Sequence, residues 1–359
     1  MAHALATSPI IQPDNSGFQP EDWAVLARCW YPVARCIDIG DQPVQVQLLD
    51  VKLVVYRTDA GVFVALDRCP HRGVPLSKGC VKENHLVCPY HGLRFNGQGS
   101  CTKIPAQPAL VPSERFKLRS LPAVERYGLL WTCLAPDAAS DIPPMPSWGA
   151  EGHQQVLPPH VDIYGSAGRQ VEGFVDVAHF AFVHHEAFAD AENPVVPTYE
   201  TTVTDGCIRS DYISTVSNFP KGLQHMAPEG FLWRRVYEIY PPFTARLTVH
   251  FPNDGLLNIL NAASPMTATS TRLFVPITRN FDTTGPVEDV YAFNAQVFAE
   301  DKEIVESQWP QDLPLEPLEE AHFAADRSSV AYRRALKDMG LRFKPKETET
   351  ETEKEKAAA

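Results

Sequence analysis

The chain has 359 residues, 44 acidic and 32 basic, so its formal net charge is −12. This acidic balance argues against nucleic acid or an anionic membrane as a partner. No apolar run reaches the roughly 18 residues of a membrane-spanning helix. The first Lys or Arg is Arg28, so the start does not resemble a signal peptide. Eight cysteines are too few for a disulfide scaffold. We expect a cytoplasmic protein of two or three domains.

The first half of the chain is typical of antiparallel strands. Residues 1–21 show no periodic pattern and predict a flexible leader. Short apolar runs, separated by turn residues, then follow at 44–48, 53–56, 62–66 and 127–133. Prolines gather between residues 136 and 160 and indicate a linker. We therefore expect a first domain over 22–145 and a second over 146–343.

The second half mixes strands with helices. Strands are predicted from Ala245 to Phe251 and from Leu256 to Leu260. Three stretches favour helices, at about 168–185, 287–309 and 315–339, the last closed by Gly340. Residues 344–359 alternate charged and polar residues and predict a disordered tail.

Two short loops carry the first candidate metal site. Cys69 and His71 are separated by one residue, Cys88 and His91 by two, and sixteen residues lie between the pairs. Zinc sites favour paired cysteines and paired histidines. Here each loop supplies one thiolate and one imidazole. This ligand set suits a [2Fe–2S] cluster in which one iron is bound by both cysteines and the other by both histidines. Zinc is the alternative, and three nearby residues fall outside the spacing: Cys80, His85 and Cys101.

A second candidate site begins with Asp176, His179 and His184. Asp176 and His179 are three residues apart, which predicts one face of a helix. His184 lies five residues beyond His179, so the helix must break or bulge if both are to meet one metal. The alternative for this segment taken alone is a helix whose histidines face solvent or have hydrogen-bond partners within the protein.

Asp301 completes this second set. It lies within three or four residues of four members of a helical apolar stripe, which consists of Val290, Phe293, Val297, Phe298, Ile304 and Val305. Its neighbours Glu300 and Lys302 fall outside the stripe. A carboxylate on a buried face is costly unless it is paired or binds a metal. Two histidines and a carboxylate form the facial triad of non-haem Fe(II) oxygenases. Pairing with a buried arginine is the alternative.

Both patterns together resemble the oxygenase component of Rieske non-haem iron oxygenases, over nearly all of residues 22–340. The similarity is greatest to methylxanthine N-demethylases, with dicamba and vanillate O-demethylases more distant. The family's second motif is Asn-x2–3-Asp-x2-His-x4-His, and Gly173 stands at its asparagine. The resemblance implies an α+β chain with a Rieske β domain followed by a helix-grip catalytic domain. It also implies a [2Fe–2S] cluster, a mononuclear Fe(II) and an α3 homotrimer, with Asp176 carrying electrons between subunits.

The resemblance further implies a terminal oxygenase. It would use O₂ and electrons from a separate reductase, directly or through a ferredoxin, to hydroxylate or oxidatively demethylate an aromatic or heteroaromatic small molecule. The alternatives are cis-dihydroxylation at the same site and a non-catalytic Rieske electron carrier. Candidate pocket residues near the iron are Phe174, Phe180, Phe182, Phe251 and Asn280.

The charge is unevenly distributed. Residues 300–326 hold nine acidic residues and one lysine, a balance of 1 − 9 = −8. Residues 67–94, around the first set of ligands, hold five basic and two acidic residues, or 5 − 2 = +3. We therefore expect an acidic electron donor to dock at the basic loops, with its encounter steered by charge.

Overall fold

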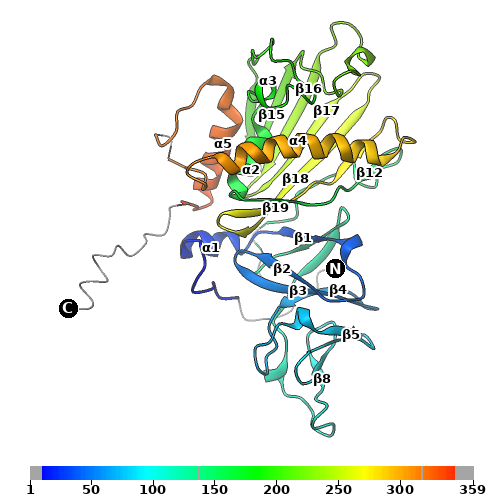
Figure 1. Ribbon diagram of the computed structural model, residues 1–359. Coiled ribbons are helices and arrows are strands. Elements are labelled where there is room, and N and C mark those ends of the chain that lie inside the picture. The colour runs from blue at the N-terminus through cyan, green and yellow to red at the C-terminus, as the bar shows by residue number, and fades with distance from the viewer. Residues whose placement is uncertain (1–9, 136–137, 139, 317, 344–359) are drawn as a thin grey trace, which may run out of the picture.

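The computed structural model describes residues 10–135, 138, 140–316 and 318–343. Strands dominate the chain and helices cover part of one large sheet, which confirms the α+β class (Figure 1). The N-terminal strands lie below this sheet in Figure 1, and β5 and β8 lie farthest from it. The expected tail at 344–359 lies outside the described residues. No described helix is long and apolar enough to cross a membrane.

Within the described residues, the N-terminal part has one α-helix and three small antiparallel sheets. The helix α1 spans Pro20–Leu26. The sheets have the orders β1-β11-β10, β2-β3-β4-β9 and β5-β6-β7-β8. Their strands are Tyr31–Arg35 (β1), Val44–Leu48 (β2), Val51–Thr58 (β3), Gly61–Leu66 (β4), Cys80–Lys82 (β5), His85–Val87 (β6), Arg94–Phe95 (β7), Cys101–Lys103 (β8), Ser120–Leu121 (β9), Ala123–Arg126 (β10) and Leu129–Thr132 (β11). The four runs expected to be strands are confirmed as β2, β3, β4 and β11.

The C-terminal part is built on a nine-stranded antiparallel sheet. Its main path is β12-β20-β18-β17-β16-β15-β14, and β19 joins β13 to β18. The strands are Gln154–Val156 (β12), Val161–Ile163 (β13), Glu200–Thr204 (β14), Cys207–Ser214 (β15), Trp233–Tyr240 (β16), Thr244–His250 (β17), Leu256–Thr267 (β18), Ser270–Phe274 (β19) and Ile277–Arg279 (β20). Both strands expected in this half are confirmed as β17 and β18, and β18 is longer than expected.

Four helices accompany this sheet, and α4 crosses in front of it (Figure 1). They are Ala167–Val175 (α2), Phe180–Val183 (α3), Val287–Ser307 (α4) and Arg327–Asp338 (α5). The helix expected at 287–309 is confirmed as α4. The helix expected at 168–185 is instead divided into α2 and α3. The helix expected at 315–339 begins only at Arg327, and Gly340 follows its end with φ +98°, a left-handed conformation that glycine adopts without strain.

The two halves share buried contacts. Leu129 and Trp131 of β11 pack in one cluster with Leu260 of β18 and Phe274 of β19. At the chain ends, the Asp22 carboxylate accepts hydrogen bonds from the backbone N–H groups of residues 342 and 343. The expected flexible leader differs from the structure from residue 10 onward, because the side chains of Ile10 and Phe18 are buried in the main core. Apolar side chains are stabilised by such burial, which fixes this segment to the sheet.

Candidate metal sites

The two loops that carry the cysteine–histidine pairs have the same backbone geometry. In each loop the cysteine N–H donates to the carbonyl five residues further on, at 2.9 Å in both loops. The cysteine carbonyl accepts from the glycine four residues on, at 2.9 Å for Gly73 and 3.1 Å for Gly92. These glycines have φ of +73° and +68°, which explains why glycine occupies both positions.

The side chains of these loops fit a shared cluster. The Cys69 and Cys88 thiols are buried, whereas the His91 ring is exposed. The His71 and His91 rings meet edge to face, with centroids 4.7 Å apart. The Nδ1 atom of His71 is buried and has no hydrogen-bond partner. A buried ring nitrogen without a partner is costly, and a metal ligand bond would satisfy it. Cys80 and Cys101 lie on the strands β5 and β8, outside these loops.

The backbone around the second set differs from the sequence expectation. α2 ends at Val175, and the next residue, Asp176, has extended backbone with φ −72° and ψ 135°. Asp176 and His179 therefore do not share one helix face, and the break lies before His179 rather than between the two histidines. His179 and His184 instead cap the two ends of the short helix α3, and the His179 carbonyl accepts the Val183 N–H at 2.8 Å. This single helical turn brings both imidazoles to the same side.

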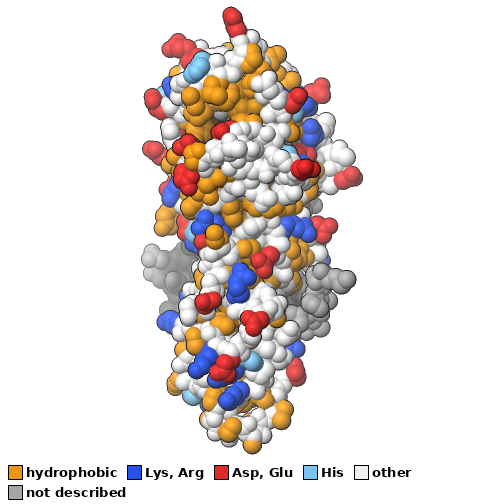
Figure 2. Space-filling model, turned by 90° about the vertical axis from the view of Figure 1, so that its right-hand side faces the viewer, with side chains coloured by type: hydrophobic (Ala, Val, Ile, Leu, Met, Phe, Trp, Pro, Cys, Tyr) orange, Lys and Arg blue, Asp and Glu red, His pale blue; other side chains and the backbone are white. Residues whose placement is uncertain are grey.

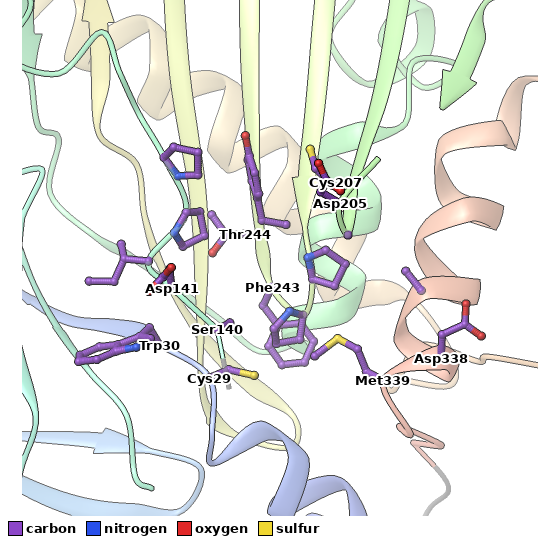
Figure 3. A pocket seen from close by; sticks show the side chains of 18 of the residues that line it. Cys29, Trp30, Ser140, Asp141, Asp205, Cys207, Phe243, Thr244, Asp338 and Met339 are labelled. Carbon is purple, nitrogen blue, oxygen red and sulfur yellow. The ribbon is translucent and has the colours of Figure 1, made fainter. Parts of the chain in front are cut away.

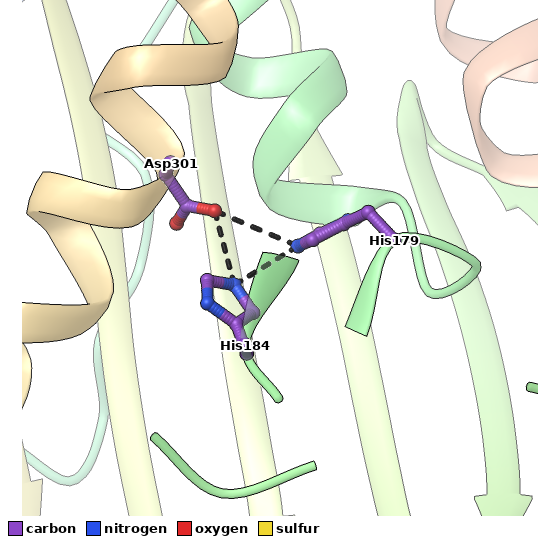
Figure 4. A group of neighbouring side chains, drawn as sticks. All are labelled: His179, His184 and Asp301. Atoms are coloured by element: carbon purple, nitrogen blue, oxygen red, sulfur yellow. Dashed lines mark hydrogen bonds and ion pairs between the residues drawn. The ribbon is translucent and has the colours of Figure 1, made fainter. Parts of the chain in front are cut away.

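His179, His184 and Asp301 converge on one point (Figure 4). The Nε2 atoms of the histidines are 3.0 Å apart. Asp301 Oδ1 lies 3.0 Å from Nε2 of His184 and 3.5 Å from Nε2 of His179. Metal–nitrogen bonds of about 2.1 Å at right angles place neighbouring ligand atoms about 3.0 Å apart. The three side chains could thus hold one metal ion on adjacent coordination positions and leave the others open.

A residue that the sequence analysis placed outside the buried face also belongs to this site. The Glu300 carboxylate Oε2 lies 2.7 Å from Nδ1 of His184, whose side chain is 2% exposed. Gln296 Nε2 donates to the other Glu300 oxygen at 3.0 Å. A carboxylate on Nδ1 fixes the proton there and directs Nε2 towards a metal. Burial lowers the pKa of His184, but its contacts with Asp301 and Glu300 outweigh burial and raise that pKa.

α4 only partly follows the expected stripe. Phe298 and Val305 are buried, and Asp301 is partly buried. Ile304 was expected on the buried face but is 46% exposed. Asn294 is buried instead, and its Nδ2 donates to the Val290 carbonyl at 2.7 Å. The sheet therefore covers a narrower side of this helix than the apolar pattern indicates.

Asp176 links the candidate metal site to the surface. Its Oδ2 lies 3.8 Å from Nδ1 of His179, and its Oδ1 accepts the Ala178 N–H at 2.6 Å. Burial raises the pKa of Asp176, but the neighbouring His179 and the Ala178 N–H outweigh burial and lower it overall, so the side chain is ionised. Asp176 and Gly173 line a cavity of about 230 Å³.

Three buried charged residues and the partly buried Glu320 hold the end of α2 that leads to Asp176. The Arg333 guanidinium donates to both Glu172 oxygens, at 2.6 and 2.8 Å, and to Glu320 at 2.6 Å. Arg169 donates to Glu320 at 2.7 Å. The Glu172 carbonyl in turn accepts the Asp176 N–H at 3.1 Å. This network connects α2, α5 and the 308–322 segment, and thereby fixes where Asp176 leaves the helix.

The expected pocket residues have different surroundings. The Phe180 ring lies 4.9 Å from the His179 ring, and Phe174 packs edge to face against Tyr237 at 6.0 Å. Phe251 is buried in an aromatic cluster with Trp233. Phe182 is 67% exposed. Asn280 lies in a turn, where its Oδ1 accepts the N–H of residue 256 at 2.6 Å.

A separate cavity of about 540 Å³ lies where the linker, the β16–β17 turn and the end of α5 meet (Figure 3). Cys29, Cys207 and three aspartates are among its lining residues. Burial raises the pKa of Cys29 to about 11, so this thiol is protonated at neutral pH. His179, His184 and Asp301 have ligand atoms that all lie within 4.8 Å of one another. Among the described residues, they are the one such group of three or more His, Cys, Asp or Glu side chains.

Comparison with known proteins gives two adjacent domain matches. Residues 29–122 match the Rieske [2Fe-2S] domain, and residues 166–342 match the vanillate O-demethylase oxygenase C-terminal domain. Methylxanthine N1-demethylase NdmA of Pseudomonas putida is 31% identical over 324 residues, which cover 88% of this chain and 89% of the relative. The oxygenase component of dicamba O-demethylase from Stenotrophomonas maltophilia is 28% identical over 309 residues, 79% of this chain and 87% of the relative.

Solved structures agree with these matches. NdmA of Pseudomonas putida CBB5 with caffeine has a TM-score of 0.78 at 28% identity, and the match covers 88% of this chain and 91% of that one. Dicamba monooxygenase bound to dicamba has a TM-score of 0.76 at 24% identity, covers 93% and 99%, and supports the fold alone. The chain therefore belongs to the Rieske non-haem iron oxygenases, and it is the oxygenase component of such an oxidoreductase. Its cofactors are the Rieske [2Fe–2S] cluster and a mononuclear iron. Within the family it is related to N- and O-demethylases.

Proposed function

We propose that this protein is a terminal oxygenase that hydroxylates or oxidatively demethylates an aromatic or heteroaromatic small molecule at a mononuclear Fe(II). The observation that carries the proposal is the convergence of His179, His184 and Asp301, with ligand atoms 3.0 to 3.5 Å apart. We assign these three residues as the iron ligands. Bound iron supplies the activation of O₂, in an environment that the protein shapes.

The cluster ligands are assigned as Cys69, His71, Cys88 and His91. Their support is the pair of matching loops, the two buried thiols and the unpartnered Nδ1 of His71. Histidine in place of cysteine on one iron raises the reduction potential of such a cluster. The backbone N–H groups of residues 73 and 92 donate hydrogen bonds to the cysteine carbonyls of their own loops and so fix the shape of each loop.

The remaining residues near the iron position its ligands and exclude water. Glu300 holds the proton on Nδ1 of His184, so that Nε2 stays available to the metal. The rings of Phe180 and Phe188 pack against the two histidines, with centroids 4.9 Å from His179 and 5.1 Å from His184. These apolar rings keep bulk solvent from the ligand side chains, which strengthens electrostatic interactions there.

Electron transfer is proposed to occur between subunits of a head-to-tail α3 trimer. Within one chain, the cluster loops and α3 lie at opposite ends of the molecule (Figure 1). His91 is exposed at one end, and Asp176 lines a surface cavity at the other. The charges of −8 over residues 300–326 and +3 over residues 67–94 are complementary. Asp176 would then accept a hydrogen bond from His179 and one from the neighbouring subunit's cluster ligand.

A separate reductase, acting directly or through a ferredoxin, is the proposed electron donor. The relatives' names describe an "oxygenase component" and the iron-sulfur subunit of a "monooxygenase system", so those proteins are parts of larger systems. Arg68, Arg72 and Lys82 are exposed near the cluster loops. Figure 2 shows Lys and Arg side chains interspersed with Asp and Glu side chains on the lower half of one face. An acidic donor should therefore reduce the cluster more slowly at high salt.

The test is O₂ uptake with a reductase partner against a panel of methylated heterocycles and methoxyarenes, with formaldehyde measured alongside. Methylxanthines, dicamba and toluene-4-sulfonate, named for the relatives, belong in this panel. Demethylation predicts stoichiometric formaldehyde and one labelled oxygen atom from ¹⁸O₂ in the initial product. A diol with two labelled atoms would show cis-dihydroxylation instead. No substrate-dependent O₂ uptake over the whole panel would count against the proposed substrate class.

A further inference from the structure

A cavity of about 550 Å³ lies directly behind the ring that covers His184. Phe188 is one of its lining residues, and the Phe188 ring stacks on the His184 imidazole with centroids 5.1 Å apart and planes 28° apart. One side chain thus separates this space from a candidate iron ligand. The volume lies in the range of about 300–1,000 Å³ that is usual for small-molecule sites.

The residues that follow His184, including Phe188, separate the cavity from this histidine. Their backbone is hydrogen-bonded to a segment on the outer side of the cavity. The carbonyl of Ala187 accepts the backbone N–H of Lys221 at 2.9 Å. The carbonyl of Phe188 accepts Nε2 of Gln224 at 3.1 Å. The segment 221–226 is exposed to solvent. These two hydrogen bonds attach the exposed outer segment to the backbone of residues 187 and 188.

The lining favours a flat, uncharged ring system. Phe188, Phe231 and Trp233 supply aromatic walls, and Phe231 holds Trp233 edge to face at 5.1 Å. Four uncharged polar side chains also line the cavity and offer hydrogen bonds. The charged lining residues are Asp190, Lys221 and Glu229, a net charge of 1 − 2 = −1. A carboxylate or sulfonate would meet net repulsion here, whereas a neutral heteroaromatic would stack on the rings.

We infer that this cavity is the vestibule through which a neutral, flat heteroaromatic substrate reaches the iron, and that Phe188 is the gate between them. The inference rests on the proposed function, because it takes His184 as an iron ligand. A smaller side chain at position 188 should open the passage, and a larger one should close it. The charge of the lining makes the passage selective against anions.

The test uses iron-loaded protein and a flat neutral chelator, 2,2′-bipyridine, as the probe. Loss of the mononuclear iron is followed by the electron paramagnetic resonance signal of its nitric oxide adduct, and the Rieske signal is recorded in the same samples. The variants are Phe188→Leu and Phe188→Trp. Phe274→Leu is the matched control, because Phe274 is a buried ring in the separate cluster with Leu129 and Trp131 and does not line the cavity.

The second-order rate of iron loss should rise at least threefold in Phe188→Leu and fall at least threefold in Phe188→Trp, with Phe274→Leu within twofold of wild type. The 4,4′-dicarboxylate of bipyridine should act at least fivefold more slowly than bipyridine on the wild type. If both Phe188 variants lost iron faster, Phe188 would be packing for His184 and no gate. Unchanged rates, or a rate independent of chelator concentration, would equally overturn the inference. A wild-type protein without the nitric oxide signal would instead refute the proposed function itself.

Discussion

Replacement of Glu300 tests how His184 is held for the metal. Its Oε2 is 2.7 Å from Nδ1 of a histidine whose side chain is 2% exposed, so little water can replace the carboxylate. Loss of such an outer partner typically lowers metal affinity by about 10- to 100-fold. That range corresponds to about 1.4 to 2.7 kcal/mol. Glu300→Gln keeps a neutral hydrogen-bond acceptor, so its Fe(II) affinity should fall by about 10-fold. Glu300→Leu removes the acceptor, so its Fe(II) affinity should fall by about 100-fold.

The assay is anaerobic calorimetric titration of Fe(II) into protein that holds its Rieske cluster but no mononuclear iron. Glu303→Gln is the matched control, because it removes one exposed carboxylate from the same helix, α4, without touching His184. Circular dichroism should show the same fold for all variants. A dissociation constant for Glu300→Leu within twofold of wild type would refute the reasoning. So would an equal weakening by Glu303→Gln, since the effect would then be one of net charge.

Three further changes follow from named contacts. Asp176→Asn should leave both iron sites loaded but largely abolish coupled turnover, because a neutral amide replaces the ionised carboxylate beside His179; full activity in single-turnover assays would exclude its bridging role. Arg333→Ala should lower the free energy of unfolding by about 3–5 kcal/mol in urea titrations, because Glu172 loses its bidentate partner; a loss below 1 kcal/mol would contradict this account. Burial raises the pKa of Asp312 to about 6, above its unfolded value, so stability should fall as pH rises from about 4 to 6. Asp312→Asn should therefore raise the melting temperature at pH 7 but not at pH 4.

The ligand residues could be predicted from the sequence because their signals are short-range. Cys69 and His71, or His179 and His184, are separated by a few residues, and such spacings are fixed by local backbone geometry. Asp301 was found by its place in an apolar helical stripe. The same stripe was wrong for Ile304, because burial depends on how much of α4 the sheet covers.

Contacts between distant segments could not be predicted in this way. Glu300 meets His184 across 116 residues of sequence, and Arg333 meets Glu172 across 161. Nothing in the spacing of these residues marks them as partners. The end of α2 likewise makes contacts across distant segments, because its Arg169 pairs with Glu320 and its Glu172 with Arg333 of α5.

The count of iron atoms per chain tests the central claim most directly. The account predicts three irons in the wild-type protein, two in the cluster and one at His179, His184 and Asp301. In Asp301→Ala the count should fall to two, with the Rieske signal of the reduced cluster unchanged. Asp338→Ala, an exposed carboxylate distant in sequence from the ligand set, should keep three. A wild-type count of two, or a count of three in Asp301→Ala, would contradict the account.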